Sequence, residues 1–363
     1  MLKGKENLKT VYTITYHHVL NHGGVLQAYA LVRILREEGY DACIIDYRPW
    51  SHLKHYYCPA KGLRRTLEKI RRERAFRSFR NRHLPTTDQA FFSRKSLEKL
   101  PPGAAYITGS DQVWNAKILG GNLDPAYFLS FSPKGSAILS YAASSGQTVL
   151  TEHSHIVSPL LNRFDWIGVR EDSLLSEAGQ LAPGIATKLV LDPSLLLEDY
   201  NEIIDTHRVP DSPYVVSYMV AEDDLLPVYN ERVRQIRNAT GLPVYHIGAR
   251  QNIDAADRNF LDLGPSEWLG FIRNAKWMIT SSFHGTAFSV IMKKNFVVVP
   301  HSVDALNRRS LTLLDSLGLQ NRFIDAEGPL YAEDFVPIDY SMVTPKLTAL
   351  RRKSLSALFA NLP

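Results

Sequence analysis

The segment over residues 277–300 places an ionisable side chain where a parallel sheet usually binds its ligands. It reads WMITSSFHGTAFSVIMKKNFVVVP, which predicts a strand, a turn, a helix and a second strand, over 277–280, 281–285, 286–293 and 296–299 in turn. In open parallel sheets, ligands bind at the carboxyl ends of strands, beside the N-termini of the helices that follow. His284 falls at such a point, and Gly285 lets the backbone approach a ligand closely. An imidazole here suits acid–base chemistry on a phosphate or carboxylate, and a histidine that only caps the helix fits the same pattern.

Five predicted strands in the first half of the chain also end in polar loops. The residues at these strand ends are, in order, NHGG (21–24), GSDQVWN (109–115), SSG (144–146), Arg170 and Asp192-Pro193. Because the carboxyl ends of parallel strands meet at one edge of a sheet, these loops predict a polar crevice along that edge. The pair Gly23-Gly24 is not a GxGxxG dinucleotide fingerprint and is weak evidence for phosphate binding.

Strands and helices alternate along the chain in a way that positions these loops. The first half opens with a strand, a helix and a strand over 11–16, 24–38 and 42–46, followed by strands over 104–108, 137–143, 166–170 and 188–191. A polar segment over 198–213 contains two prolines and reads as a linker. The alternation then restarts, which predicts an α/β fold with two Rossmann-like domains facing a cleft.

The second half continues this alternation to the end of the chain. The predicted strands lie over 214–220, 244–248, 260–264 and, after the central stretch, 322–325. The predicted helices lie over 225–239, 267–274, from Arg308 to a stop at Gly318, and over 345–359. We assign residues 1–200 and 211–345 to the two domains and 346–363 to a C-terminal helix.

Composition and cysteine content exclude several classes of protein. The chain has 363 residues, 45% hydrophobic and 22% charged, as in soluble globular proteins. No apolar run is long enough to span a membrane and the N-terminus lacks an apolar signal core, so we expect a cytoplasmic protein. Cys43 and Cys58 form neither a disulfide framework nor a CxxC motif. His17, His18 and His22 cluster without an acidic residue at metal spacing, so we predict no metal site.

Residues 61–83, KGLRRTLEKIRRERAFRSFRNRH, combine an apolar stripe with a basic surround. Ten arginines and lysines accompany only Glu68 and Glu73, and the stripe consists of Leu63, Leu67, Ile70, Phe76 and Phe79. An exposed amphipathic helix docked by its stripe explains this pattern. A helix that contacts an anionic membrane surface or a pyrophosphate-bearing substrate explains it too. No nucleic-acid-binding module accompanies the segment, so we expect no nucleic-acid partner.

Several motifs together resemble the polysaccharide pyruvyl transferase family. They are NHGGVLQAYAL (21–31), GSDQVWN (109–115), SYAASSG (140–146), VREDS (169–173), LDPSLLL (191–197), SSFHGTAFSVIMKKNF (281–296) and RRSLTLLDSLGL (308–319). The resemblance covers most of the chain, and the order and spacing of the motifs make it specific. It implies a GT-B-like fold and transfer of pyruvate from phosphoenolpyruvate to a sugar as a ketal. The implied acceptors are cell-surface glycans or their lipid-linked precursors.

The resemblance also assigns roles to individual residues. It makes His284 and Arg170 the residues of the phosphoenolpyruvate site, with His284 as general acid. Asp111 is our candidate for orienting or deprotonating an acceptor hydroxyl, and an Asx turn that closes its loop explains the same residue. Some family members have arginine two residues before the histidine, where this chain has Ser282. The substrate-binding residues that we expect are Gly23, Gly24, Gln27, Ser110, Asn115, Ser144, Ser282, Gly285, Arg308 and Arg309.

These expectations define the partners and leave two alternatives open. Phosphoenolpyruvate is the donor substrate, no further cofactor is expected, and the acceptor glycan is lipid-linked. The first domain, which includes residues 61–83, is then the acceptor side and the second the donor side. The basic segment brings the enzyme to the inner face of the membrane. The alternatives are a GT-B glycosyltransferase that uses a nucleotide sugar, and a non-catalytic domain of a larger redox assembly, against which the lack of iron–sulfur cysteines counts.

Overall fold

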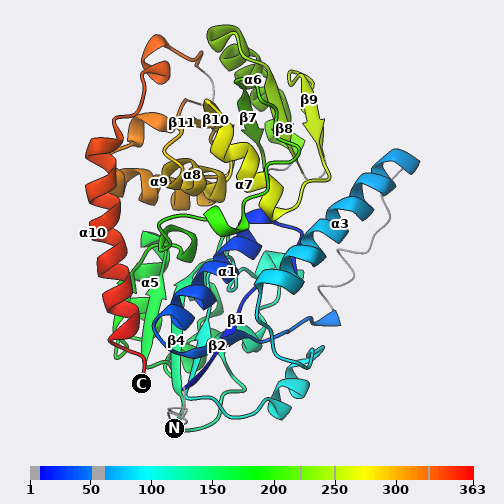
Figure 1. Ribbon diagram of the computed structural model, residues 1–363. Coiled ribbons are helices and arrows are strands. Elements are labelled where there is room, and N and C mark those ends of the chain that lie inside the picture. Colours follow the sequence, from blue (N-terminus) through cyan, green and yellow to red (C-terminus); the bar gives the residue numbers. More distant parts are fainter. Residues whose placement is uncertain (1–8, 51–61, 221–222, 249–250, 326–327) are drawn as a thin grey trace, which may run out of the picture.

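The computed structural model describes residues 9–50, 62–220, 223–248, 251–325 and 328–363 (Figure 1). Cys58 and the first residue of the basic segment, Lys61, lie outside the described residues. The described part contains two parallel β-sheets, one from each half of the chain, with helices packed around them. Among these residues, no helix has the length and apolar character needed to cross a membrane.

The first sheet has six parallel strands in the order β2-β1-β3-β4-β5-β6. Their bounds are β1 Thr10–Ile14, β2 Asp41–Ile44, β3 Ala105–Thr108, β4 Ala137–Ala143, β5 Trp166–Val169 and β6 Thr187–Leu189. The described α-helices of this half are α1 His22–Glu37, α3 Leu63–His83, α4 Ser154–Leu161 and α5 Asp172–Leu181. Strands β3 and β5 are buried along their whole length, as in parallel sheets that are covered on both faces.

The second sheet has five parallel strands in the order β11-β10-β7-β8-β9. Their bounds are β7 Val215–Tyr218, β8 Val244–Ile247, β9 Arg258–Phe260, β10 Trp277–Thr280 and β11 Asn295–Val298. The helices of this half are α6 Leu226–Thr240, α7 Pro265–Asn274, α8 Phe283–Ile291 and α9 Asp304–Leu317. Two parallel sheets with alternating helices confirm the predicted α/β fold with two Rossmann-like units.

The last helix, α10 Tyr340–Phe359, returns to the first half of the chain along one flank of the molecule (Figure 1). The hydroxyl of Ser354 accepts a 3.0 Å hydrogen bond from the backbone N–H of Leu191, and Arg351 Nε donates to the Leu195 carbonyl at 2.9 Å. The ring of Phe359 stacks on Tyr40. This helix therefore holds the loop after β6, which carries functional residues, in place.

His22, one of the three clustered histidines, lies where the two halves meet. Its side chain is fully buried and stacks on Trp268 of α7, with ring centroids 5.4 Å apart, while Phe76 of α3 lies 5.0 Å away. Its Nε2 lies 3.0 Å from the Leu263 carbonyl, and burial lowers the pKa of the imidazole well below its usual value. A neutral His22 is thus a packing residue between α1, α3 and the second sheet.

Several predicted boundaries were wrong for identifiable reasons. Helix α8 begins at Phe283 instead of residue 286, because Ser282 already caps it and draws His284 and Gly285 into its first turn. Residues 322–325 form no strand: they follow a short 3₁₀ helix, Gln320–Arg322, and only Phe323 makes a single bridge, to Val298. Helix α10 begins at Tyr340 instead of Pro345, because the Asp339 side chain accepts the N–H of Ser341 at 2.9 Å and caps it earlier. The third strand of the second half, β9, spans Arg258–Phe260, earlier than predicted.

Candidate functional site

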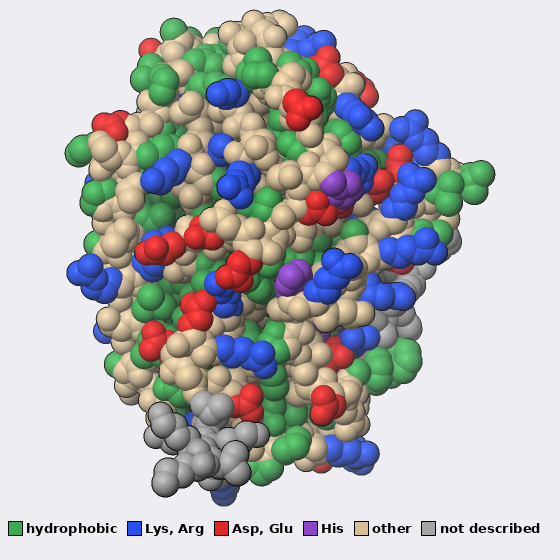
Figure 2. Space-filling view, in the orientation of Figure 1, with side chains coloured by type: hydrophobic (Ala, Val, Ile, Leu, Met, Phe, Trp, Pro, Cys, Tyr) green, Lys and Arg blue, Asp and Glu red, His purple; other side chains and the backbone are tan. Residues whose placement is uncertain are grey.

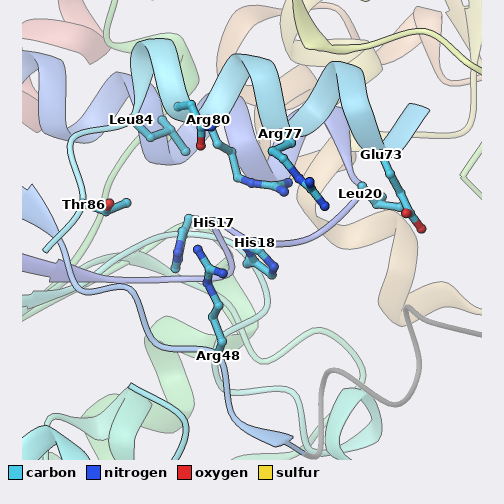
Figure 3. Close-up of a pocket in the computed structure, with 10 residues that line it drawn as sticks. His17, His18, Leu20, Arg48, Glu73, Arg77, Arg80, Leu84 and Thr86 are labelled. Atoms are coloured by element: carbon cyan, nitrogen blue, oxygen red, sulfur yellow. The ribbon is translucent and has the colours of Figure 1, made fainter. Parts of the chain in front are cut away.

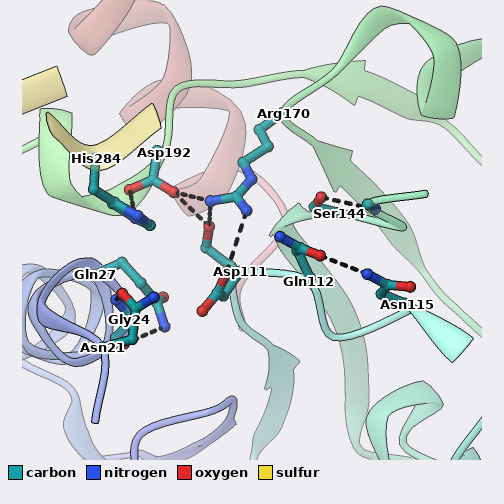
Figure 4. Close-up of polar contacts among 12 residues, drawn as sticks. Asn21, Gly24, Gln27, Asp111, Gln112, Asn115, Ser144, Arg170, Asp192 and His284 are labelled. Atoms are coloured by element: carbon teal, nitrogen blue, oxygen red, sulfur yellow. Dashed lines mark hydrogen bonds and ion pairs between the residues drawn. The ribbon is translucent and has the colours of Figure 1, made fainter. Parts of the chain in front are cut away.

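Polar residues from both sheets converge at the carboxyl ends of their strands. From the first sheet come Asp111 after β3, Arg170 after β5 and Asp192 after β6. From the second sheet comes His284, in the first turn of α8 after β10. Figure 4 shows the side chains of Arg170, Asp192 and His284 pointing toward one another. The tertiary structure therefore brings together residues that lie up to about a hundred and seventy positions apart in the sequence.

Asp192 is the centre of this cluster. Its Oδ2 accepts a 2.6 Å hydrogen bond from Arg170 Nη1 and another of 2.6 Å from the hydroxyl of Ser110. Its Oδ1 accepts from the backbone N–H and the hydroxyl of Ser194, at 3.0 and 2.7 Å. The Nε2 atom of His284 lies 3.8 Å from the same Oδ1. One carboxylate thus fixes Arg170 and stands beside the histidine.

Burial sets the charges of the cluster. Burial lowers the pKa of His284 to about 4, with Arg170 and Arg309 acting in the same direction and Asp192 and Asp111 opposing it. Burial also opposes ionisation of Asp192, but His284, Arg170 and hydroxyl donors outweigh it and hold its pKa at about 2. Because His284 is neutral at neutral pH, Arg170 is the cation that keeps Asp192 ionised there.

Asp111 lies at the solvent edge of the cluster. Its Oδ1 is 3.5 Å from Arg170 Nη2, and its side chain is 16% exposed, against 1% for Arg170. The backbone at Asp111 has φ of 73°, a left-handed conformation that aspartate and asparagine tolerate better than most residues. The Asx turn and the catalytic interpretation therefore both remain compatible with its geometry.

Gly23 and Gly24 let the N-terminus of α1 pack directly on the cluster. A Cβ atom at Gly23 would lie 2.0 Å from Cγ of His284, and one at Gly24 would lie 2.9 Å from Oδ2 of Asp111. The side chain of Asn21 caps the helix by accepting the Gly24 N–H at 3.0 Å. The two glycines thus leave room for the side chains of the site.

Three other expected binding residues make hydrogen bonds within the strand-end loops and the helix that follows β1. Gln27 donates from Nε2 to the hydroxyl of Thr15 at 2.9 Å. The Asn115 Oδ1 atom accepts the N–H of Lys117 at 3.0 Å and caps a short 3₁₀ helix, Ala116–Leu119. The Ser144 hydroxyl accepts the N–H of Gly146 at 3.2 Å. All three side chains are buried, so each position stabilises a strand-end loop.

Ser282 and Gly285 position His284. The Ser282 hydroxyl accepts the N–H of Gly285 at 3.4 Å and caps α8. A Cβ atom at Gly285 would lie 2.2 Å from the hydroxyl oxygen of Thr280, so only glycine lets α8 pack this closely on β10. Both residues therefore determine where the imidazole sits.

Of the two candidate arginines on α9, only Arg309 reaches the cluster. Arg308 is exposed, whereas Arg309 is buried with its guanidinium 5.9 Å from the ring of Phe283. The guanidinium of Arg170 lies 5.0 Å from the same ring. Burial and the charge of Arg170 lower the pKa of Arg309 from its usual value. Arg309 thus places a second guanidinium group near the ring of Phe283 that Arg170 also contacts.

Three buried nitrogen atoms in the cluster have no hydrogen-bond partner among the described residues. They are Nε of Arg170, Nε of Arg309 and Nε2 of His284. Buried polar atoms are nearly always paired, and leaving them unpaired costs on the order of 1–3 kcal/mol each. An anion with several oxygen atoms can form hydrogen bonds with these unpaired nitrogens of the two guanidinium groups and the imidazole.

Sequence reasoning missed the central role of Asp192. It placed this residue only at the end of a strand, because its partners Ser110 and Arg170 lie 82 and 22 positions away in sequence. A signal for Arg309 was present. On a helix, residue 309 shares a face with Leu313 and Leu317, which are both buried, whereas residue 308 does not.

Comparisons with solved structures agree with the observed fold. Among solved structures, S. aureus MnaA with UDP is 10% identical, with 98% of each chain covered and a TM-score of 0.54. The UDP-GlcNAc 2-epimerase of Methanocaldococcus jannaschii is 10% identical over 93% of this chain and 91% of its own, with a TM-score of 0.52. The glycotransferase of kitacinnamycin is 12% identical over 98% and 100%, with a TM-score of 0.50. These likenesses show a GT-B fold.

The sequence comparisons give the family. No curated protein matches the sequence. A family model described as polysaccharide pyruvyl transferase matches residues 21–303, which contain Asp111, Arg170, Asp192 and His284. The match covers more than half of the chain, and this chain belongs to the polysaccharide pyruvyl transferase family.

Proposed function

We propose that the protein transfers the pyruvyl group of phosphoenolpyruvate onto two hydroxyls of a glycan sugar as a cyclic ketal. The observation that carries this proposal is the set of unpaired buried nitrogens on Arg170, Arg309 and His284. Phosphoenolpyruvate carries a phosphate and a carboxylate, and guanidinium groups bind both by paired hydrogen bonds. Because two cations lie over Phe283, a doubly anionic donor relieves their mutual repulsion.

The proposed reaction needs a proton on carbon and loses two protons from the acceptor. Protonation of the methylene carbon makes C2 electrophilic, and one sugar hydroxyl attacks C2 and releases its proton. Phosphate then leaves, and the second hydroxyl attacks C2 to close the ketal. One of the two hydroxyl protons replaces the proton placed on carbon, and the other leaves with phosphate.

His284 is the proposed proton donor. In the free protein its pKa of about 4 leaves it neutral at pH 7. Binding of an anionic donor beside Nε2 favours the imidazolium form of His284, so the substrate itself promotes protonation of the residue that acts as general acid. Asp192, 3.8 Å from Nε2, supports the charged ring.

Asp111 is the proposed group that orients or deprotonates an acceptor hydroxyl. It is the carboxylate of the cluster that reaches solvent, and its contact with Arg170 places it beside the donor. Because Arg170 comes from the first sheet and both His284 and Arg309 come from the second, donor contacts arise from both halves. This geometry favours a shared donor site over our initial division into an acceptor domain and a donor domain.

The direct test follows phosphate release from phosphoenolpyruvate, with and without a lipid-linked glycan acceptor. We expect acceptor-dependent release, and a loss of about a hundredfold or more in rate for His284→Ala. Because His284 is buried against Gly23, circular dichroism must show that this variant is folded. Full turnover in a folded His284→Ala protein would exclude the proposed acid.

The proposal requires no cofactor beyond the donor substrate. We therefore expect phosphate release to survive dialysis against EDTA. We also propose that the protein acts in the cytoplasm, at the inner face of the membrane where a lipid-linked acceptor would lie. Loss of activity after EDTA treatment, restored by a divalent cation, would contradict the cofactor-free reaction.

A second candidate function follows from the fold. S. aureus MnaA, which shares the GT-B fold, was solved with UDP. A nucleotide-sugar glycosyltransferase would place diphosphate oxygens on the same arginines. It predicts saturable UDP binding that phosphoenolpyruvate displaces, whereas the pyruvyl transferase predicts phosphoenolpyruvate binding without measurable affinity for UDP.

A further inference from the structure

A cavity of about 440 Å³ lies under the inner half of α3. Its volume is in the range of pockets that hold small molecules. The loop after β1 and the segment after β2 form the wall opposite α3 (Figure 3). Within the part of the chain that the structure describes, no residue lining this cavity belongs to the cluster around Asp192. The cavity is therefore a distinct candidate site.

The lining of this cavity is predominantly basic. Figure 3 shows Arg77 and Arg80 reaching from α3 toward His18, while Arg48 rises from the opposite wall. Among the described residues that line the cavity, the only carboxylate is that of Glu73. Arg48 is partly compensated, because its Nε donates to Asp46 at 2.6 Å beneath the cavity. Three arginines against one glutamate give the described lining more positive than negative groups, which favours an anionic occupant.

A metal ion is the competing occupant. Ligand atoms of His17, His18 and Asp46 lie within 4.8 Å of one another, which corrects the expectation that no acidic residue accompanies these histidines. However, Asp46 is already engaged by His17 at 3.0 Å and by Arg48. Burial lowers the pKa of His18 to about 3, and Arg80 and Arg48 contribute to this shift. The positive charges of Arg80 and Arg48, which act on His18 in addition to burial, also disfavour a divalent cation at this place.

The cavity and the Asp192 cluster share one edge of the first sheet. His17 Nδ1 lies 3.2 Å from the carbonyl of Thr15, and the Thr15 hydroxyl donates to the carbonyl of Ser110 at 2.7 Å. Leu20, which lines the cavity, directly precedes the residue that caps α1. A ligand held in the cavity therefore lies next to the loop that carries Asp111.

We propose that this cavity binds the phosphate or diphosphate group of a phosphorylated acceptor. Arg77, Arg80 and Arg48 contact the phosphate oxygens, and the sugar extends toward Asp111. The identity of the ligand as the acceptor rests on the proposed function, whereas recognition of a phosphate does not. Guanidinium groups on two walls suit a group with oxygens on several sides.

The test measures binding of inorganic pyrophosphate by calorimetry in the presence of saturating phosphoenolpyruvate, which occupies the other cationic site. We expect saturable binding that Arg77→Gln and Arg80→Gln each weaken on the order of tenfold. Arg82→Gln is the matched control, since it removes an exposed charge from the same helix outside the cavity. Equal affinity in all four proteins would overturn the proposal.

Further measurements separate the sources of phosphate and the role of the proposed function. If phosphatidylglycerol vesicles bind in an Arg77-dependent way while pyrophosphate does not, the cavity recognises a lipid headgroup and the acceptor assignment is wrong. Zinc binding that is lost in His18→Ala, without pyrophosphate binding, would make it a metal site. If the protein binds pyrophosphate but releases no phosphate from phosphoenolpyruvate, the phosphate site in the cavity is supported and the proposed pyruvyl transfer is excluded.

Discussion

Arg170 donates a 2.6 Å hydrogen bond to Asp192 where both side chains are almost completely enclosed, with 1% and 0% of their surface exposed. A buried ion pair of this kind contributes little net stability as a pair, but removing one partner leaves an uncompensated buried charge. Asp192 also ties together the loops that carry Ser110 and Ser194. The ion pair of Arg170 and Asp192 therefore holds the loops of the site together and also fixes the charges within it.

For Asp192→Asn we expect a loss of about 3–5 kcal/mol in the free energy of unfolding, because Arg170 stays charged and buried. Urea denaturation measures this loss. Asp257→Asn is the control: it weakens a pair in which Arg237 is 48% and Asp257 28% exposed, while the new amide oxygen can still accept the N–H of Val244, so it should cost at most about 1 kcal/mol. Similar losses in the two variants would show that Asp192 is not the counterion that the site requires.

For Arg170→Lys we expect a raised KM for phosphoenolpyruvate with little change in the KM for the acceptor. Lysine keeps the charge but cannot make planar two-point contacts, and it cannot bond Asp192 and Ser110 together as Arg170 Nη1 does. Steady-state kinetics with each substrate varied in turn is the measurement. An equal effect on both KM values would show that Arg170 orders the whole site.

Binding of phosphoenolpyruvate should be accompanied by proton uptake at pH 7. His284 is neutral in the free protein because burial holds its pKa at about 4, and the bound anion raises that pKa. Calorimetry in two buffers with different ionisation enthalpies measures the protons taken up. His284→Gln should take up fewer protons than the parent protein, and an unchanged number would place the titrating group elsewhere.

The stability of the protein should fall as pH decreases from 6.5 toward 5. Burial lowers the pKa of His246 to about 3 and that of His284 to about 4, below the value near 6.5 of an unfolded histidine. In this window the unfolded chain binds more protons, so each histidine contributes up to about 1.4 kcal/mol per pH unit. Denaturation at several pH values measures the slope.

His246→Gln tests the origin of that slope. His246 lies on β8 with its Nδ1 2.9 Å from the hydroxyl of Ser217, away from the cluster around Asp192. Between pH 6.5 and 5, we expect the free energy of unfolding of the variant to depend less steeply on pH, by the contribution of one histidine. The depressed pKa of Asp192 contributes little in this window, because its effect on stability develops mainly below about pH 5. An unchanged slope would contradict the assignment.

Much of the fold was predictable from the sequence because strand and helix periodicities agree with the tertiary packing. The strand over 277–280 was predicted at its observed bounds, since apolar residues fill it and a polar turn follows. The strand predicted over 322–325 was wrong because short apolar runs do not specify pairing, and only Phe323 finds a partner.

The candidate site was predictable where one residue marks a strand end, as with His284 and Arg170. The roles of residues whose partners lie far away in the sequence could not be predicted. Asp192 became central only because β6 lies beside β5 and sets it against Arg170. Gly285 was expected at a ligand, but its absent side chain makes room for Thr280.

Helix α3 divides into a docked half and an exposed half, which the single apolar stripe in the sequence did not predict. Phe76 and Phe79 are buried against the first half of the chain, whereas Leu63 is 79% exposed. Leu67 and Ile70 are exposed as well. Figure 2 shows basic side chains gathered along this helix, with apolar side chains at its projecting end. Arg72, expected at the basic surface, is buried instead and donates to the Leu20 carbonyl at 2.8 Å.

We expect the exposed half of α3 to bind anionic membranes weakly and in a salt-sensitive manner. Apolar side chains ringed by Arg64, Arg65, Arg71 and Arg74 suit the membrane interface, and each basic residue contributes about 1 kcal/mol near an anionic surface. Reversing these four charges to glutamate should abolish co-sedimentation with phosphatidylglycerol vesicles at low salt. It should also lower activity on a lipid-linked acceptor while sparing a soluble glycoside that carries the same sugar.

The control for this last experiment reverses four exposed basic residues outside α3, namely Lys134, Lys188, Arg352 and Lys353. Both variants lose the same net charge, so a difference between them reports the position of the charges and not their number. Salt should weaken binding of the parent protein, because charges on the surface are screened within about 10 Å at 0.1 M. Equal losses in the two variants, or equal losses on the two acceptors, would make the exposed half of α3 an ordinary solvated surface.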